Sequence, residues 1–414
     1  MQYGCIGETL KHSFSAEIHP LLTEHTYELC EIAKEDLDAF MQRRSFCGIN
    51  VTIPYKTAVI PHLYELDEQA RVIGAVNTVV NRDGKLYGYN TDFYGMRTLL
   101  NQIGANLLGK KVAVLGTGGT SKTAIAVANS LGAREVLRVS RSGKDGAITY
   151  DELRKEHNDI EAVINTTPVG MYPHANETPL PLDGFDQLCC VADAVYNPLR
   201  TRLILDARER GIAAEGGLLM LVAQAVRASE IFHDCTYAQD TAIRIWQQMM
   251  RKKENIVLIG MPACGKTTVG KLLAEKLGRR FCDMDEEITN AVGRTPAQII
   301  REDGEPTFRE IETQILKEKI ASRTGEVIAT GGGAILKKEN VRLLRQNGRL
   351  FFLDRPWQKL VPTSDRPLSG TAEQIERRYR ERYSLYCEAC DVRIEDPDTA
   401  ESAAERIGKD FKAL

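Results

Sequence analysis

The chain has 414 residues, of which 43% are hydrophobic and 27% are charged, and its formal net charge is -3 at pH 7. This length predicts two or three domains, each with its own core, and the composition is typical of a globular protein. The small negative charge gives no basic surface for nucleic acid or an anionic membrane, so we expect small-molecule partners.

The sequence contains no targeting or membrane signal that we recognise. No run of about 18 apolar residues occurs, and the first residues lack the basic-then-apolar order of a signal peptide. The ten cysteines are scattered, which favours reduced thiols and a cytoplasmic location. Cys387 and Cys390 have no second ligand pair, so we interpret them as a helix face rather than a zinc site. The sequence sets no oligomeric state.

Two halves meet near residues 245–255, where an apolar helical pattern runs through a basic cluster into the strand-like stretch NIVLIG. No linker rich in Pro, Gly or Ser separates them, so we expect a short connection. We predict one half over 1–250 and another over 251–414, each of the α/β class with a largely parallel sheet.

In the first half, residues 110–133 read KKVAVLGTGGTSKTAIAVANSLGA, which predicts a buried strand, a glycine turn and a helix. Gly116, Gly118 and Gly119 allow the backbone to approach a pyrophosphate at the N-terminus of the helix. Ser121 replaces the third glycine of the usual dinucleotide-binding motif, so the turn alone is a weak signal.

The next predicted strand, 135–141, ends in Ser140, Arg141 and Ser142. An NAD-specific fold places an acidic residue at this point for the ribose 2′-hydroxyl, whereas an arginine accommodates the 2′-phosphate of NADP. We therefore expect NADPH as the cofactor; the alternative is an exposed arginine at a strand end.

Several short polar segments of the first half each close an apolar stretch. They are HSFSAEIH (12–19), NVTIPYK (50–56), GAVNT (74–78), GYNTD (88–92), NTTPVGM (165–171), DAVYNPLRT (193–201) and GGLLMLVAQA (216–225). Together they resemble the shikimate dehydrogenases, and the resemblance covers essentially all of residues 1–245. It implies a two-part fold with a substrate-binding part (1–100 and 216–245) and a Rossmann NADP-binding part (101–215).

The resemblance also implies which residues form the site. Lys56 and Asp92 would be the catalytic pair, because a lysine ammonium can stabilise and protonate the oxygen that gains charge when a ketone is reduced. Asp92 would orient the lysine first and accept a proton second. The residues implied to surround the polyhydroxylated substrate are Ser13, Ser15, Thr52, Asn77, Asp92 and Gln224. The sequence departs from the family at Ala16, Thr117 and Thr120.

In the second half, GMPACGKTTVG (260–270) fits the P-loop pattern in full. Backbone N–H groups of such a loop wrap nucleotide phosphates, Lys266 reaches the transferred phosphoryl group, and the Thr267 hydroxyl ligates Mg²⁺. The predicted nucleotide-binding residues are Gly260, Gly265, Lys266, Thr267 and Thr268.

Asp283 and Asp285 stand two residues apart in FCDMDEEI (281–288). On an extended segment both would point the same way, so that one could face a metal and the other a substrate. The alternative is a pair of exposed acids in a loop.

Four further segments, GEPTFREIE (304–312), TGGGAI (330–335), SDRPLSG (364–370) and ERYSLY (381–386), resemble the shikimate kinases together with the P-loop, over residues 255–410. The resemblance implies that Asp283 helps to hold Mg²⁺ and that Arg366 lies on a lid over ATP. Two arginines suit the planar carboxylate of shikimate, and an acid beside its hydroxyl can take the proton. The implied shikimate-binding residues are Asp285, Arg309, Gly332, Gly333 and Arg382. Ala263 and Ser384 depart from the pattern.

The sequence therefore predicts NADPH-dependent reduction of 3-dehydroshikimate to shikimate, followed by phosphorylation of the shikimate 3-hydroxyl by Mg-ATP. Two alternatives remain. The first half could be an NAD-preferring quinate/shikimate dehydrogenase, or the P-loop half could be a regulatory nucleotide-binding module that transfers no phosphate.

Overall fold

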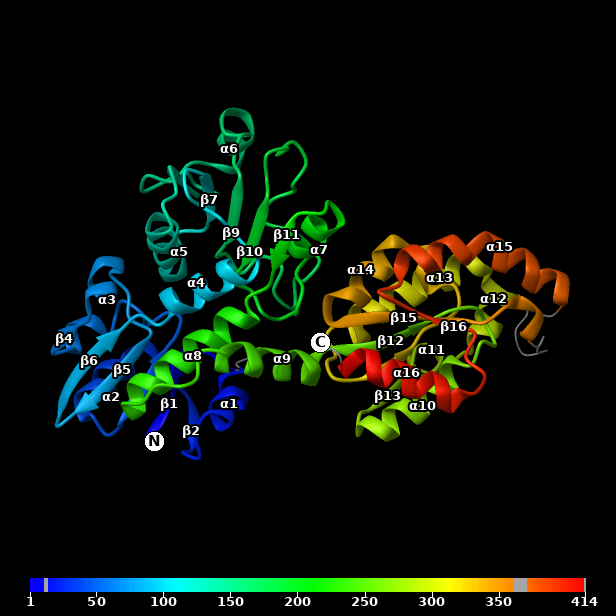
Figure 1. Ribbon diagram of the computed structural model, residues 1–414, viewed down its shortest axis with the longest axis horizontal. Helices are drawn as coiled ribbons and strands as arrows, with labels where there is room; N and C mark the ends of the chain where they lie inside the picture. The colour runs from blue at the N-terminus through cyan, green and yellow to red at the C-terminus, as the bar shows by residue number, and fades with distance from the viewer. Residues whose placement is uncertain (11–13, 361–370, 413–414) are drawn as a thin grey trace. The chain divides into compact units, whose positions relative to one another are not determined.

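The computed structural model describes residues 1–10, 14–360 and 371–412 (Figure 1). These divide into two compact units, Met1–Met249 and Met250–Leu414, and the division falls within helix α9 (Thr241–Lys253). Ser13 and Arg366 of the predicted sites lie outside the described residues.

The first unit begins with a six-stranded mixed sheet in the order β2-β1-β3-β5-β6-β4. The strands β2, β1 and β3 are parallel, while β3, β5 and β6 pair antiparallel. The strands are β1 (Tyr3–Gly7), β2 (Tyr27–Glu31), β3 (Gly48–Val51), β4 (Glu65–Leu66), β5 (Thr78–Arg82) and β6 (Lys85–Tyr89). The helices of this part are α1 (Ser15–Ile18), α2 (Leu37–Arg43), α3 (Glu68–Ile73) and α8 (Leu218–His233).

Helix α8 returns to this part of the unit from much later in the sequence (Figure 1). It packs against α4 (Asp92–Gln102), where Met96 and Leu99 share a buried cluster with Leu219. A Cβ atom added at Gly95 would lie 2.5 Å from the carbonyl oxygen of Met220, so this glycine allows the close approach of the two helices.

The second sheet of the first unit is fully parallel, in the order β11-β10-β9-β7-β8. Its direction of growth reverses between β7 and β9, and ligands of open α/β sheets bind at the carboxyl ends of the strands beside such a point. The strands are β7 (Lys111–Leu115), β8 (Glu135–Val139), β9 (Ala162–Asn165), β10 (Cys190–Asp193) and β11 (Ala213–Glu215), and the helices are α5 (Gly119–Ser130), α6 (Tyr150–Glu156) and α7 (Arg202–Glu209).

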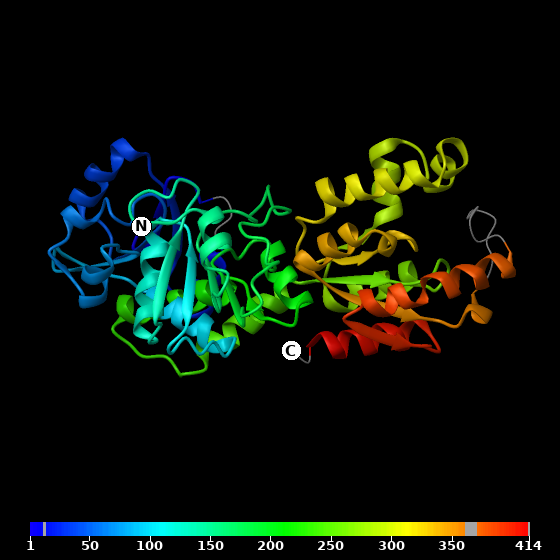
Figure 2. The same cartoon turned by 90° about the horizontal axis from the view of Figure 1, so that it is seen from above.

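The second unit contains one parallel sheet in the order β13-β14-β12-β15-β16, with helices on both of its faces (Figure 2). Every residue of the central strand β12 is buried, as its continuous apolar run predicts. The strands are β12 (Asn255–Ile259), β13 (Phe281–Asp283), β14 (Val327–Ala329), β15 (Gly348–Asp354) and β16 (Val392–Glu395). The helices are α10 (Lys266–Leu277), α11 (Met284–Val292), α12 (Pro296–Asp303), α13 (Glu305–Ile315), α14 (Lys338–Asn347), α15 (Ala372–Ala389) and α16 (Ala400–Lys412).

The predicted α/β class is confirmed in both units, and two of the three sheets are fully parallel, whereas the first sheet of the first unit is mixed. Within the described ranges, no helix combines the length and the apolar character needed to cross a bilayer.

Candidate active sites

Lys56 and Asp92 form a short ion pair in the first unit. Lys56 Nζ lies 2.5 Å from Asp92 Oδ2, and the two side chains are 14% and 10% exposed. Lys56 follows β3 and Asp92 is the first residue of α4. Because little water reaches the pair, solvent and salt screen it weakly and the ammonium is held in one place.

The second oxygen of this carboxylate accepts from an amide that belongs to a network of amide and hydroxyl groups. Asn77 Nδ2 donates to Asp92 Oδ1 at 2.9 Å, and the Thr91 backbone N–H donates to Asn77 Oδ1 at 2.7 Å. Gln224 Oε1 accepts from Thr91 Oγ1 at 3.3 Å. The structure therefore brings together Lys56, Asn77, Asp92 and Gln224, which lie up to 168 residues apart in the sequence.

Asn50 and Thr91 belong to the same network, although the sequence analysis assigned neither of them. Asn50 Nδ2 donates to Thr78 Oγ1 at 3.1 Å, and Asn50 Oδ1 accepts from Tyr27 Oη at 2.7 Å. Both residues are buried. The sequence signal that could have identified Asn50 and Thr91 was their position inside two of the polar segments, 50–56 and 88–92.

Ser15 and Thr52 come from neighbouring loops of the first sheet. Ser15 is buried and begins α1, while Thr52 directly follows β3. Because β1 and β3 are adjacent parallel strands, the chain leaves both at the same edge of the sheet. The Thr52 backbone N–H donates to the Ile6 carbonyl at 3.0 Å, which fixes the start of its loop.

The glycine turn lies at the carboxyl end of β7. Gly116 has a φ of 111°, and a Cβ atom there would lie 2.8 Å from Thr166 Oγ1, so a larger residue would not fit. Around Gly118, the N-cap of α5, a Cβ atom would meet nothing within 4 Å. Ser121 Oγ donates to the Gly116 carbonyl at 2.7 Å, so the serine that departs from the motif closes the turn. The open backbone at the helix start fits a pyrophosphate.

The Lys56 side chain lies beside this turn. A Cβ atom at Gly119 would be 3.6 Å from Lys56 Cδ. The ion pair and the glycine turn are therefore neighbours within the first unit, as a reaction between a substrate and a dinucleotide requires.

Arg141 lies just beyond β8, which ends at Val139. The side chain is exposed, and no carboxylate of the described residues forms an ion pair with it. Ser140 Oγ accepts from the Gly143 backbone N–H at 3.1 Å and so holds the loop in a turn. An unpaired guanidinium at this point fits a phosphate on the adenosine ribose.

Asp193 organises the loops at the carboxyl ends of β9 and β10, a role that the sequence analysis missed. Its carboxylate accepts from Asn165 Nδ2 at 2.9 Å, from the Val195 backbone N–H at 2.9 Å and from Thr201 Oγ1 at 2.6 Å. Burial raises the pKa of the Asp193 carboxyl to about 7, against the lowering effect of these hydrogen bonds.

In the second unit, the P-loop follows β12. Gly260 and Gly265 have φ values of 148° and 98°, and Ala263 also adopts a positive φ, of 64°. Lys266 Nζ donates to the carbonyls of Gly260 and Met261, both at 2.9 Å. The loop therefore curls around its own lysine, and its backbone N–H groups at the start of α10 fit nucleotide phosphates. The exposed Thr268 follows in the first turn of that helix.

Asp283 and Asp285 do not lie on one extended segment, so that prediction was wrong. The strand ends at Asp283, and the side chain of this residue caps α11 by accepting from the Asp285 backbone N–H at 3.0 Å. Asp283 Oδ2 also accepts from Thr267 Oγ1 at 2.8 Å. A hydroxyl and a carboxylate that converge in this way suit Mg²⁺, although no group of three or more His, Cys, Asp or Glu within the described ranges forms a metal cluster.

The three-glycine turn after β14 lies between the P-loop and two arginines. A Cβ atom at Gly332 would be 2.6 Å from Pro262 Cδ, and one at Gly333 would overlap the Arg309 guanidinium. The Gly332 carbonyl accepts from Arg382 Nη1 at 3.2 Å and from the Tyr386 hydroxyl. The turn therefore needs glycine because other groups approach it closely on two sides.

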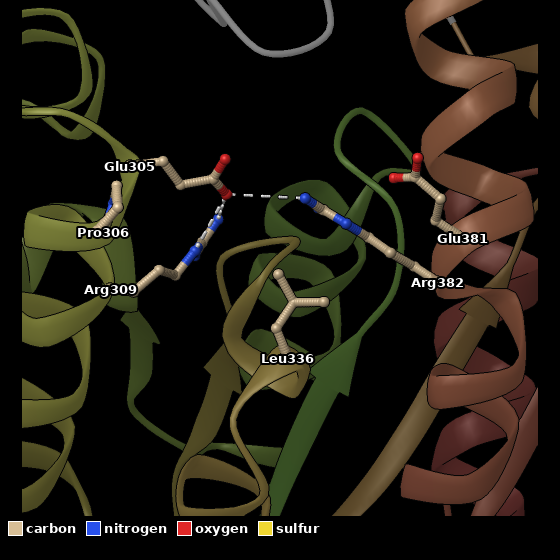
Figure 3. Close-up of a pocket in the computed structure, with 6 residues that line it drawn as sticks. All are labelled: Glu305, Pro306, Arg309, Leu336, Glu381 and Arg382. Carbon is tan, nitrogen blue, oxygen red and sulfur yellow. Dashed lines mark hydrogen bonds and ion pairs between the residues drawn. The ribbon is translucent and has the colours of Figure 1, made fainter.

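A pocket of about 430 Å³ opens next to this turn (Figure 3). Arg309 on α13 and Arg382 on α15 point into it. Behind Arg309 lies Glu312, which is fully buried and accepts from Arg309 Nη1 at 2.8 Å. Burial raises the pKa of the Glu312 carboxyl, and the Arg309 guanidinium opposes that shift. The residues that line the pocket are Glu305, Pro306, Arg309, Leu336, Glu381 and Arg382.

All ten cysteines are free thiols. Cys387 is exposed and lies in the last turn of α15, with Cys390 directly after the helix. Cys390 Sγ donates to the Cys387 carbonyl at 3.4 Å, which is a local contact at a helix end.

Two family models match parts of the chain. The substrate binding domain of shikimate dehydrogenase matches residues 5–79, and shikimate kinase matches residues 262–412. Among curated relatives, the shikimate dehydrogenase (NADP(+)) of Clostridium beijerinckii is 39% identical over 250 residues, which are 56% of this chain and 92% of the relative. That of Clostridium perfringens (strain 13) is 36% identical over 265 residues, covering 60% of this chain and 97% of the relative.

Solved structures agree with these matches. A chorismate mutase/shikimate 5-dehydrogenase fusion protein from Clostridium acetobutylicum is 34% identical, with a TM-score of 0.57, and the match covers 60% of this chain and 97% of that chain. A shikimate 5-dehydrogenase from Thermus thermophilus in complex with NADP(H) and shikimate is 28% identical, with a TM-score of 0.53, over 60% and 99%. The chain thus belongs to the shikimate dehydrogenase family through its first unit and carries a shikimate kinase domain in its second, so that one polypeptide joins two enzymes of the shikimate pathway.

Proposed function

We propose that the first unit reduces 3-dehydroshikimate to shikimate with NADPH and that the second phosphorylates the shikimate 3-hydroxyl with Mg-ATP. The observation that carries the first assignment is the Lys56–Asp92 ion pair beside the Gly119 turn. The second rests on the P-loop together with the two arginines of the nearby pocket. We propose residues 1–250 and 251–414 as the bounds of the two enzymes, with 1–100 and 216–245 as the substrate-binding part and 101–215 as the NADP-binding part of the first.

In the reduction, NADPH bound at the glycine turn supplies the hydride. Lys56 donates a proton to the ketone oxygen of the substrate while the carbonyl carbon gains that hydride, and Lys56 is reprotonated from solvent. Asp92 keeps the ammonium aimed at one point, and Asn77 in turn keeps Asp92 in its rotamer. Ser13, Ser15, Thr52 and Gln224 offer hydroxyl and amide groups to the substrate hydroxyls, each of which would cost about 1–3 kcal/mol if buried unpaired.

Preference for NADPH over NADH rests on Arg141. Its guanidinium is exposed, and no carboxylate of the described part of the chain neutralises it. An NAD-preferring site would instead carry an acid at this strand end.

In the phosphoryl transfer, Mg-ATP bound at the P-loop supplies the phosphoryl group. Arg309 and Arg382 hold the substrate carboxylate, and Gly332 and Gly333 let the ring approach the backbone. Asp285 accepts the proton of the reacting hydroxyl, while Lys266 stabilises the charge on the phosphoryl oxygens. Thr267 and Asp283 would hold Mg²⁺, and we assign Arg366 to a lid over the nucleotide from the sequence resemblance alone.

The product of the first reaction is then the substrate of the second. Small molecules are the proposed partners, without nucleic acid, and free cysteines throughout the chain favour a reducing cytoplasmic location.

One incubation tests both proposals. Purified protein is mixed with 3-dehydroshikimate, NADPH and Mg-ATP, and the products are identified by mass. We expect shikimate 3-phosphate. Accumulation of shikimate would contradict the kinase assignment, and unchanged substrate would contradict the dehydrogenase assignment, after which shikimate is supplied directly to test the second unit.

Two variants separate the activities. Lys56→Ala should lower kcat of reduction by about 10²–10⁴-fold and leave phosphorylation of added shikimate unchanged. Lys266→Ala should do the converse, with a loss of at least about 10²-fold. Lys85→Ala is the control for Lys56→Ala, and Lys271→Ala is the control for Lys266→Ala. Each control removes an exposed lysine from the unit that carries the active-site variant. If either active-site variant abolishes both reactions, the assignment of two separate sites is wrong.

A further inference from the structure

Glu305 lies between the two arginines of the kinase pocket (Figure 3). Its Oε1 atom is 3.0 Å from Arg309 Nη2 and 3.3 Å from Arg309 Nε, so the arginine presents two N–H groups to one oxygen. The same oxygen lies 3.8 Å from Arg382 Nη2. One carboxylate of the chain therefore occupies the space between two guanidinium groups that come from different helices.

The two arginines depend on Glu305 to different degrees. Arg309 has a second partner in Glu312, which is fully buried behind it. Arg382 is 7% exposed, and among the described residues Glu305 carries the single carboxylate within 4.0 Å of its guanidinium. A mostly buried charge with one counter-ion is costly to leave unpaired, so Arg382 retains Glu305 until another anion replaces it.

The position of Glu305 allows its side chain to move away from the two arginines into solvent. It is the first residue of α13, its side chain is 32% exposed, and it follows Gly304, which has a φ of 88°. A glutamate at an exposed first turn can rotate into water without disturbing the packed side of the helix. Arg309, at 11% exposed, and Arg382, at 7%, are more buried than Glu305.

We propose that Glu305 is the internal counter-ion of Arg309 and Arg382 in the kinase pocket and that the substrate carboxylate binds by exchanging with it. This inference rests on the proposed function, in which the two arginines hold that carboxylate. The exchange weakens the binding of every anion by a similar factor. A ligand that carries hydroxyls beside its carboxylate, and contacts Asp285 and the glycine turn with them, still binds. A simple anion lacks these contacts, so Glu305 lowers the occupancy of the pocket by phosphate and by unrelated carboxylates at a given concentration.

The test measures ligand binding to the full chain by calorimetry. Glu305→Gln keeps the shape of the side chain and removes its charge. We expect shikimate, benzoate and inorganic phosphate each to bind about fivefold more tightly, which corresponds to about 1 kcal/mol. Glu310→Gln is the matched control, because it removes the same charge from an exposed position of the same helix, and shikimate affinity should not change.

Three further measurements make the outcome decisive. The methyl ester of shikimate should bind Glu305→Gln and the wild type equally, because it has no carboxylate to exchange. Unchanged or weaker binding of shikimate to Glu305→Gln, or an equal gain for the ester, overturns the proposal; Glu305→Ala repeats the test should the glutamine variant fold poorly. Arg382→Lys tests the proposed function separately: if it leaves shikimate affinity unchanged, the carboxylate site itself is misassigned, whereas a loss of affinity there with no gain in Glu305→Gln rejects the counter-ion alone.

Discussion

Buried carboxylates serve two different purposes in this chain. Asp193 accepts hydrogen bonds from an amide, a backbone N–H and a hydroxyl, and no cation among the described residues compensates its burial. Glu312 is paired with a guanidinium that the substrate is proposed to contact. The first carboxylate holds two loops together, and the second holds an arginine in position.

Asp193 should make the stability of the first unit depend on pH. Because burial raises its pKa to about 7, the folded protein binds a proton between pH 4 and 7 that the unfolded chain has already released. Its contribution is therefore full below pH 4 and is lost as the pH rises through 7. Asp193→Asn removes this titration, so the free energy of unfolding of the wild type relative to the variant should fall with rising pH, by at most ~1.4 kcal/mol per pH unit.

Urea unfolding of both proteins between pH 5 and pH 8 measures this difference. The comparison cancels all other titrating groups, which the two chains share. Parallel curves for wild type and variant, or a difference that grows with pH, would contradict the raised pKa.

At this scale, the sequence predicted the residues that stand in dense polar segments. Lys56, Asn77 and Asp92 were predicted because the segments that contain them resemble those of the shikimate dehydrogenases. Glu305 and Asp193 were not assigned a role, although both lie inside segments that the analysis quoted. Their roles follow from partners on other elements, Arg382 and Thr201, and such contacts are not encoded in local spacing.

At the scale of elements, the P-loop combines a fitting pattern with one residue under strain. Ala263 has a φ of 64°, a conformation that costs an L-residue with a Cβ roughly 1–2 kcal/mol and costs glycine almost nothing. The alanine at position 263, where the sequence departs from the family, therefore strains the backbone of the P-loop.

Ala263→Gly should stabilise the second unit by about 0.5–1 kcal/mol, because relief of the strain exceeds the added freedom of glycine in the unfolded chain. Ala291→Gly is the control with the opposite sign, because Ala291 lies in the helical conformation within α11 and is exposed. Chemical unfolding of the two variants measures both effects. A lower stability of Ala263→Gly would show that the loop is not strained at this position.

Strands and helices with continuous or periodic apolar patterns were predicted closely. Helix α10 ends at Leu277, and Gly278 after it adopts the left-handed conformation that favours glycine. The extended reading of 281–288 failed because the Asp283 side chain caps a helix that begins at the next residue. Aspartate is common at helix N-caps, so the sequence was also compatible with a helix start at this point. The contact of Asp283 Oδ2 with Thr267 is tertiary, and it leaves Oδ1 to accept from the Asp285 backbone N–H.

At the scale of the whole molecule, each unit has its own ligands, and the two tryptophans report on them separately. Trp246 lies in the first unit and Trp357 in the second. In Trp357→Phe, NADP⁺ at about 100 times its Kd should stabilise the unfolding transition seen by Trp246 by about 2.7 kcal/mol. In Trp246→Phe, Mg-ADP should do the same for Trp357.

The crossed additions are the controls. NADP⁺ should leave the Trp357 transition unchanged, and Mg-ADP should leave the Trp246 transition unchanged. If either ligand shifts both transitions equally, the two units unfold together as one cooperative unit, and their stabilities are not independent.

The packing of α8 on α4 determines when the first enzyme can be completed during synthesis. Met96 and Leu99 are made early, but the face that covers them arrives with Leu219 after the whole second sheet has left the ribosome. Such long-range pairing is slow to form, so the first hundred residues must wait as an incomplete, partly apolar intermediate. The kinase sheet has no such discontinuity, because its strands and helices are contiguous in the chain. We therefore expect the dehydrogenase to be the part of this protein that is more prone to aggregate while it is being made.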